Sequence, residues 1–174
     1  MLLLKHRRIK GIHVRKILSR GLLASYLVIL IWFVLFKLDF NIPQVFDYHH
    51  RSLSLVPFTD GGTIGEMIDN VIIFIPFGLL LNVNFKRVGF LPKFVSILAC
   101  SVAFELIQFI FAIGATSTTD VITNTVGGFL GLKLYGLSSQ SMNSRKLDRV
   151  IVAVGTLLLV VLLYYRISIV HIKY

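Results

Sequence analysis

Five long apolar stretches, separated by clusters of charged residues, constrain the fold of this chain more than any other feature. A helix needs about 20 mostly apolar residues to cross a bilayer, and about 17 are tolerated. The charge content is 15% and the mean hydropathy is +0.83, whereas about 25% of a typical soluble domain is charged. The sequence therefore predicts an all-α fold, a polytopic membrane helical bundle with about five transmembrane helices. The stretches cover residues 21–38, 68–83, 94–113, 121–137 and 150–165.

The lysines and arginines predict how these helices are oriented, because basic residues in short loops stay on the cytoplasmic side. Seven of them, and no acid, lie in residues 1–20, and most of the others follow the second and fourth stretches. The pattern places the N-terminus inside and the C-terminus outside. It divides the chain into a basic cytoplasmic arm (1–20), a transmembrane helical domain (21–165) and a short C-terminal tail (166–174).

The basic arm has two other interpretations. It resembles the start of a signal peptide, but the first apolar stretch ends in FKLDFN (36–41) without a small-x-small cleavage site, which favours a retained anchor. The net charge of +10 would suit nucleic acid, but there is no basic motif interleaved with aromatic residues. We therefore expect no nucleic-acid partner, and anionic inner-leaflet lipid as the partner of the arm.

Carboxylate and amide side chains recur near the outer ends of the second, third and fourth predicted helices. Within each pair the spacing is three or four residues, which places both members on one helical face. An unpaired charge at the bilayer centre costs about 2.5 to 3.5 kcal/mol, so Glu105 should be paired, solvated or protonated. Arg51, in the preceding outer loop, is its candidate partner. The pairs are Glu66 with Asn70, Glu105 with Gln108, and Asp120 with Asn124.

Glycine and proline positions predict how these helices pack. Gly127 and Gly131 continue the stripe of Asp120 and Asn124, and small residues allow close helix packing in lipid, so we expect the third and fourth helices to pack together. Pro76 predicts a kink or local unwinding in the second helix. The sequence VPF (56–58) predicts a turn or a re-entrant segment before it.

Several of these residues also have purely structural interpretations. Glu105 and Gln108 would serve as well to fix helix packing through a buried hydrogen bond, and Asp120 to cap a helix. Arg51 would simply be solvated in an exposed loop. His49 and His50 are adjacent, but neighbours on a strand point to opposite faces and no companion ligand follows at metal-site spacing. We therefore expect no metal and no cofactor.

Four segments of this chain are similar, in order and spacing, to the motifs of the VanZ-like family. The segments are RSLSLVPF (51–58), NVIIFIPFGLLL (70–81), ELIQ (105–108) and TDVITNTVGGFLG (119–131). The resemblance implies a small polytopic protein of the bacterial cell membrane, linked to lowered teicoplanin susceptibility. Many members carry an arginine or aspartate where this chain has Gly114 and Ser117, which leaves the loop less charged here. The family's recurring residues correspond to Arg51, Pro57, Asn70, Pro76, Gly78, Glu105, Gln108, Asp120, Asn124, Gly127 and Gly131.

Three functional hypotheses follow. The leading one is a non-enzymatic envelope protein whose outward-facing polar pocket binds the head group of a lipid or lipid-linked cell-wall precursor, or shields it from a glycopeptide. The second is a membrane-embedded enzyme acting on such a lipid, with Glu105 and Asp120 as acid and base. The third is a transporter with Glu105 as a proton-coupled gate. The predicted ligand-binding residues are Arg51, Glu66, Asn70, Glu105, Gln108, Asp120 and Asn124.

Overall fold

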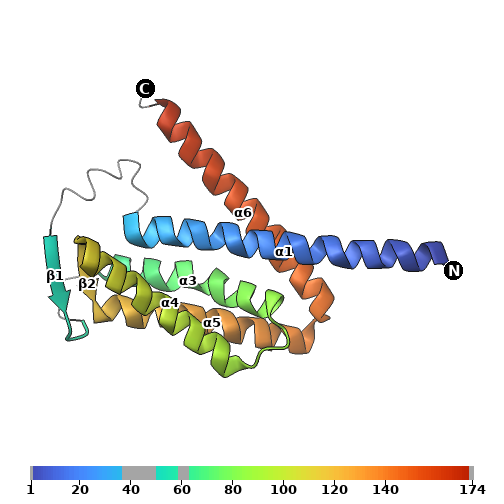
Figure 1. The fold of residues 1–174 in the computed structure, drawn as a ribbon, viewed down its shortest axis with the longest axis horizontal. Helices are drawn as coiled ribbons and strands as arrows, with labels where there is room; N and C mark the ends of the chain where they lie inside the picture. The colour runs from blue at the N-terminus through green and yellow to red at the C-terminus, as the bar shows by residue number, and fades with distance from the viewer. Residues whose placement is uncertain (1, 37–49, 59–62, 173–174) are drawn as a thin grey trace.

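The computed structural model describes residues 2–36, 50–58 and 63–172 and is almost entirely helical (Figure 1). This confirms the predicted helical bundle, with each apolar stretch lying largely in one helix. Lys37 and Leu38, at the end of the first predicted span, and the histidine His49 lie outside the described residues. In chain order the elements are α1 (Leu2–Phe36), β1 (His50–Ser54), α3 (Ile64–Asn84), α4 (Phe90–Phe111), β2 (Ile113–Ser117), α5 (Thr118–Ser141) and α6 (Ser144–Ile172).

Three of these helices contain segments long and apolar enough to cross a membrane, within the part of the chain that the structure describes. They are Lys16–Leu35 in α1, Ile64–Asn84 in α3 and Phe90–Phe111 in α4. The basic arm is helical and continuous with the first span, since α1 begins at Leu2. A crossing by α5 and by α6 remains a prediction from the sequence.

Helices α3 and α5 pack at very short range because glycines line their interface. A methyl group added at Gly127 would lie 2.2 Å from the carbonyl oxygen of Val71, and one at Gly131 would lie 2.1 Å from that of Ile75. The glycine stripe was expected to face the third span, and that part of the prediction was wrong. The backbones of α3 and α5 meet where no side chain intervenes.

Helix α4 covers a neighbouring face of α5, as predicted. Gly128, one residue beyond Gly127, faces α4, where an added methyl group would lie 2.4 Å from Ile97 Cγ2. Ile97 and Phe74 are fully buried, and the ring of Phe74 meets the edge of Phe104 at a centroid distance of 6.3 Å. The three helices α3, α4 and α5 therefore form the central bundle (Figure 1).

Helix α3 continues through Pro76 from Ile64 to Asn84, so of the kink or local unwinding expected there the unwinding does not occur and the kink stays a prediction. A proline removes only one backbone donor, and the remaining bonds keep the helix intact. Helix α1 lies across this helix, and the Tyr26 hydroxyl donates a hydrogen bond to the carbonyl of Ile73. Helix α6 crosses α1 and leans away from the bundle toward the C-terminus (Figure 1).

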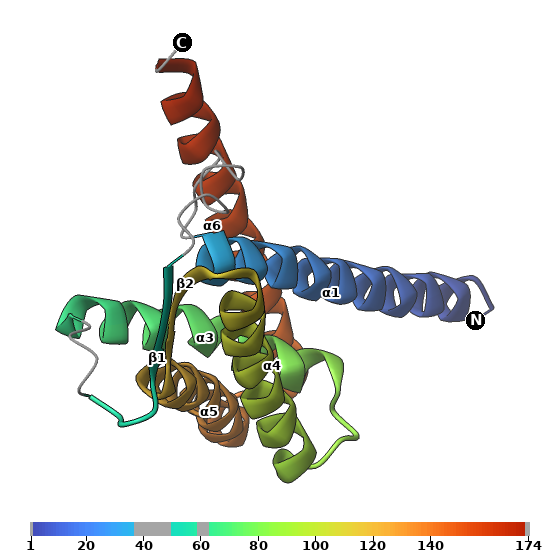
Figure 2. The same ribbon diagram turned by 60° about the vertical axis from the view of Figure 1, so that its left-hand side comes forward.

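Two short parallel strands, which the sequence did not predict, lie side by side at one end of the bundle (Figure 2). Strand β1 pairs with β2 so that Arg51 lies opposite Gly114 and Ser54 opposite Ser117. Helix α4 ends at Phe111, and the C-cap Ala112, with a positive φ of 53°, turns the chain into β2. The turn expected at VPF is present, and Phe58 N donates to Thr119 Oγ1 at 2.8 Å. The ribbon therefore ties the loop before α3 to the start of α5.

Candidate functional site

Asn70 and Asp120 bring α3 and α5 together near the strand pair. Asn70 Nδ2 donates to Asp120 Oδ1 at 2.7 Å. Asp120 lies in the first turn of α5, where a carboxylate is stabilised by the positive end of the helix dipole. The side-chain cap of α5 is Ser117, whose Oγ accepts from Thr119 N at 3.0 Å. Asp120 is therefore available for a contact across the helix interface.

Glu105 is buried between α4 and the start of α5, with an exposed fraction of 4%. Its Oε2 accepts a hydrogen bond from the backbone N–H of Ser117 at 2.8 Å, and its carbonyl accepts from Thr116 Oγ1 at 3.3 Å. Because Ser117 is the N-cap of α5, the carboxylate lies at the positive end of that helix dipole. The N-terminus of α5 therefore lies beside the Glu105 carboxylate, for which the sequence suggested Arg51 as the partner. The side chain of Arg51 lies outside the described residues, so that pairing stays a prediction.

Gln108 and Asn124 each use their amide nitrogen in a hydrogen bond, while the amide oxygen has no partner among the residues that the structure describes. Gln108 Nε2 donates to the carbonyl of Val34 on α1 at 2.9 Å, and Asn124 Nδ2 donates to Ser101 Oγ at 3.1 Å. Gln108 Oε1 and Asn124 Oδ1 are buried without a hydrogen-bond partner among the described residues. Most buried polar side-chain atoms in proteins have a partner, so these two acceptors leave room for a donor from water or a ligand.

Glu66, the remaining predicted member, is exposed in the first turn of α3. Its Oε2 accepts from Thr63 N at 2.9 Å, while Thr63 Oγ1 accepts from Glu66 N at 3.2 Å. This reciprocal pair is a capping box, which stabilises the beginning of the helix. Glu66 therefore has a local role at the rim, one turn before Asn70.

The structure adds hydroxyl residues that the sequence analysis left out of the site. Thr119 is 2% exposed and accepts a hydrogen bond from Phe58 N, and Ser117 caps α5. Ser101 lies on the Glu105 face of α4 and receives the amide of Asn124. The pattern from Ser117 to Asp120 has the spacing of a helix N-terminus signal, and this signal could have identified Ser117.

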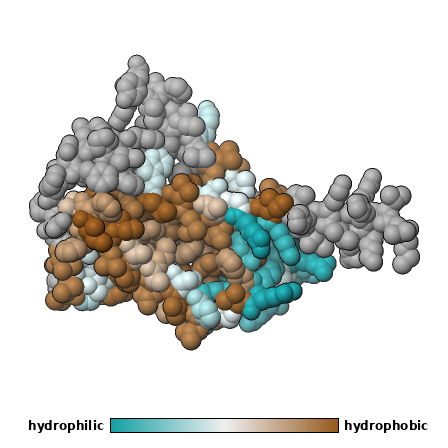
Figure 3. All heavy atoms as spheres, in the orientation of Figure 1, coloured by the Kyte–Doolittle hydropathy of each residue, from teal (hydrophilic) through white to brown (hydrophobic). Residues whose placement is uncertain are grey.

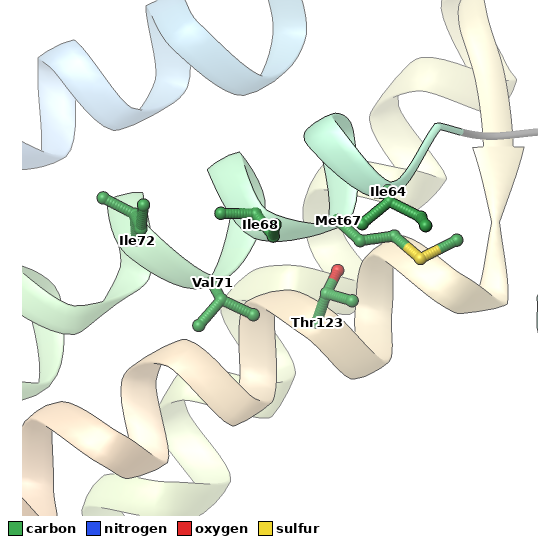
Figure 4. Close-up of a pocket in the computed structure, with 6 residues that line it drawn as sticks. All are labelled: Ile64, Met67, Ile68, Val71, Ile72 and Thr123. Atoms are coloured by element: carbon green, nitrogen blue, oxygen red, sulfur yellow. The ribbon is translucent and has the colours of Figure 1, made fainter.

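An apolar groove adjoins this polar group along α3 and α5 (Figure 4). It has a volume of about 220 Å³ and opens at the surface. Thr123 contributes from α5, one turn beyond Asp120, and its hydroxyl donates to the carbonyl of Thr119 at 3.0 Å. The groove therefore begins next to the Asn70–Asp120 pair. The lining residues are Ile64, Met67, Ile68, Val71, Ile72 and Thr123.

Apolar helices that enclose buried carboxylate and amide groups define a small helical membrane protein with a polar site shared by α3, α4 and α5. The chain belongs to the VanZ/LLP1 family, whose model matches residues 23–139. It is 75% identical over 151 residues to Protein VanZ of Enterococcus faecium, an alignment that covers 87% of this chain and 94% of that protein. Membership confirms the resemblance seen in the motifs and, at the level of the family, the link with teicoplanin resistance. No solved structure matches the chain.

Proposed function

We propose that this chain is a multi-pass protein of the bacterial cell membrane that lowers susceptibility to teicoplanin by binding the head group of a lipid or lipid-linked cell-wall precursor. The proposal is supported by two buried acceptors, Gln108 Oε1 and Asn124 Oδ1, which have no hydrogen-bond partner in the part of the chain that the structure describes. They lie on helices that also hold Glu105 and Asp120. The match over most of Protein VanZ supports the assignment to resistance.

The chemistry of the site suits a head group rich in donors. Carboxylate and amide oxygens accept hydrogen bonds from sugar hydroxyls and peptide N–H groups. Asp120 is partly exposed, so it would meet such a ligand at the surface. Arg51 would supply a cation for a phosphate or a terminal carboxylate. A lipid tail would leave this head group along the neighbouring groove, whose lining is apolar except for Thr123.

The proposed topology places the N-terminus and the basic arm inside, with anionic inner-leaflet lipid against the arm. Hydrophobic side chains cover the middle of the bundle, and hydrophilic ones gather at the end opposite the strands (Figure 3). That end holds Lys86, Arg87 and Arg145, as the positive-inside rule requires. A reporter fused after Tyr174 should then be extracytoplasmic, and a cytoplasmic signal would contradict the proposed orientation.

The binding proposal is tested by the lipid that copurifies with the protein. Mass spectrometry should identify a lipid with a hydroxyl-rich or peptide-bearing head group in the wild type, and less of it in Asn70→Ala and in Asp120→Ala. Glu66→Gln is the matched control, because glutamine preserves the capping box at the same end of the bundle. Equal recovery of the same lipid from all four proteins would overturn the proposal.

The chemical state of the membrane lipid distinguishes the catalytic alternative from the binding proposal. Glu105 and Asp120 have unlike surroundings, one buried and one partly exposed, as an acid and a base require. If the site is catalytic, the membrane lipid should be chemically altered by the wild type and unaltered by Glu105→Gln. A binding site leaves the lipid unchanged in both.

A further inference from the structure

Lys93 is a buried cation at the other end of the bundle. It lies in the first turn of α4 with an exposed fraction of 7%, and its Nζ donates to Asn82 Oδ1 on α3 at 2.7 Å. Asn82 Nδ2 in turn donates to the carbonyl of Leu132 on α5 at 3.0 Å. Lys93 on α4 is therefore linked through Asn82 on α3 to the backbone of α5.

The hydrogen bonds that Lys93 makes leave its charge uncompensated. An ammonium has three donors, and its partner Asn82 is neutral. Among the described residues no carboxylate lies within ion-pair distance of Lys93, and the ion pair at this end joins Lys86 to Asp148. The C-terminal carbonyls of α3 offset part of the charge, and an anion close to the ammonium would offset more of it. The site calls for an anion.

A second lysine, Lys133, follows Leu132 on α5 and lies next to an aromatic cluster. Lys133 Nζ lies 5.1 Å from the ring centre of Phe90 and 5.5 Å from that of Phe129. Phe94 stacks on Phe90 at 6.1 Å and meets the edge of Phe129 at 6.2 Å. Lys133 follows Leu132, whose carbonyl accepts from Asn82. Lys133 therefore lies at the junction of α4 and α5, beside the first turn of α4, which also carries Lys93.

The surface around this junction is strongly basic and borders an apolar face. Asp148 is an acidic residue at this end of the bundle, and both Lys86 and Tyr135 bind its carboxylate. Phe90 is 45% exposed, which leaves apolar surface directly beside the lysines. Figure 3 shows the hydrophilic patch of this end against the hydrophobic middle of the bundle. Exposed basic side chains around it are Lys86, Arg87, Lys133, Arg145, Lys146 and Arg149.

We propose that Lys93 and Lys133 bind the phosphate of an anionic phospholipid, whose acyl chains lie against Phe90, Phe94 and Phe129. At a single depth in the membrane, a phospholipid supplies both an anion for Lys93 and hydrocarbon that covers the exposed aromatic face. A soluble anion supplies only the first. The site lies at the opposite end of α3 and α5 from Asn70 and Asp120, and on other helices than the basic arm, so it does not depend on the proposed head-group site.

The test measures how phosphatidylglycerol raises the melting temperature of the full chain in a neutral detergent. Phosphatidylcholine and inorganic phosphate are the separate arms. Phosphatidylcholine tests acyl chains without a net negative charge, and inorganic phosphate tests an anion without acyl chains. The variants are Lys93→Met and Lys133→Gln. Lys146→Gln is the matched control, because it removes one exposed charge at the same end.

The wild type should be stabilised by phosphatidylglycerol and by neither of the other additives. Lys133→Gln should weaken the apparent affinity about tenfold, the effect of losing one charge-assisted hydrogen bond, and Lys146→Gln should have little effect. Lys93→Met should weaken the apparent affinity at least as much. If Lys93→Met does not fold, Lys133→Gln alone tests the proposal. An equal loss in Lys133→Gln and Lys146→Gln would show diffuse attraction and overturn the proposal, as would equal stabilisation by phosphate alone.

Discussion

The carboxylate of Glu105 on α4 holds the residue that caps α5, since Glu105 Oε2 accepts from the backbone N–H of Ser117 at 2.8 Å. Ser117 Oγ then accepts from Thr119 N, which begins the helix. A charged group deep in the third apolar stretch therefore orients the helix that carries Asp120 and Asn124. The same contact ties strand β2 to α4, so Glu105 determines the shape of the candidate site even without touching a ligand.

Replacing Glu105 should separate its structural role from its charge. Glu105→Ala removes the acceptor of the Ser117 N–H, and a hydrogen bond to a charged group contributes about 1.5 to 3 kcal/mol. Glu105→Gln retains an acceptor oxygen and should lose less. Thermal unfolding of the purified variants measures both. A glutamine variant as unstable as the alanine variant would show that the charge, next to the dipole of α5, is what matters.

The close approach of α3 and α5 predicts a large effect from a single methyl group. In Gly131→Ala the new Cβ would lie 2.1 Å from the carbonyl oxygen of Ile75, which must move, and overpacking of this kind costs about 1 to 3 kcal/mol or more. Gly136, one turn further along α5, has nothing within 4 Å of an added Cβ. Gly136→Ala should therefore leave the melting temperature unchanged or raise it. Similar losses in both variants would contradict the helix packing.

The hydrogen bond between Asn70 and Asp120 should appear as a coupling energy between α3 and α5. A double-mutant cycle with Asn70→Ala and Asp120→Ala should give about 0.6 kcal/mol, and at most about 1.7 kcal/mol, as for other side-chain bonds between membrane helices. The measurement is reversible unfolding in detergent. Additive effects of the two substitutions would mean that the 2.7 Å contact does not form.

Lys86 predicts a loss of stability at alkaline pH. Burial alone would lower the pKa of Lys86, but its hydrogen bonds and attraction to Asp148 and Tyr135 outweigh burial and raise that pKa above 10.5. A raised pKa in the folded state adds stability that is fully present below 10.5 and is lost as the pH rises through the folded value.

The contribution of Lys86 should stay below about 1 kcal/mol, because its side chain is 44% exposed and solvent screens the pair. In melting experiments Lys86→Met should remove a small part of the alkaline loss. Asp148→Asn is the control and should remove the same part. A Lys86→Met protein with an unchanged alkaline profile would argue against the pair.

The positions of the helices could be predicted from the sequence because they follow from local apolar length. Contacts between distant segments could not. Gln108 reaches the carbonyl of Val34, and Arg51 pairs with Gly114 in the strand ribbon. No local pattern encodes such pairings, since each depends on how the packed helices bring remote segments together.

The site itself could be predicted in part. The pairing of Asn70 with Asp120 agrees with the expected convergence of α3 and α5 at one end of the bundle. Glu66 forms a capping box, and its spacing from Thr63 is the sequence signature of that motif. The sequence therefore carries a local signal for the capping role of Glu66.

Teicoplanin susceptibility is the property that an outward-facing polar site should control. Sensitive cells would express the wild type, Asp120→Ala, Asn124→Ala or Glu66→Gln at matched membrane abundance. Wild type and Glu66→Gln should lower susceptibility equally, whereas Asp120→Ala and Asn124→Ala should lose most of that protection while remaining folded in the membrane. Full protection by both alanine variants would contradict this role of the polar site.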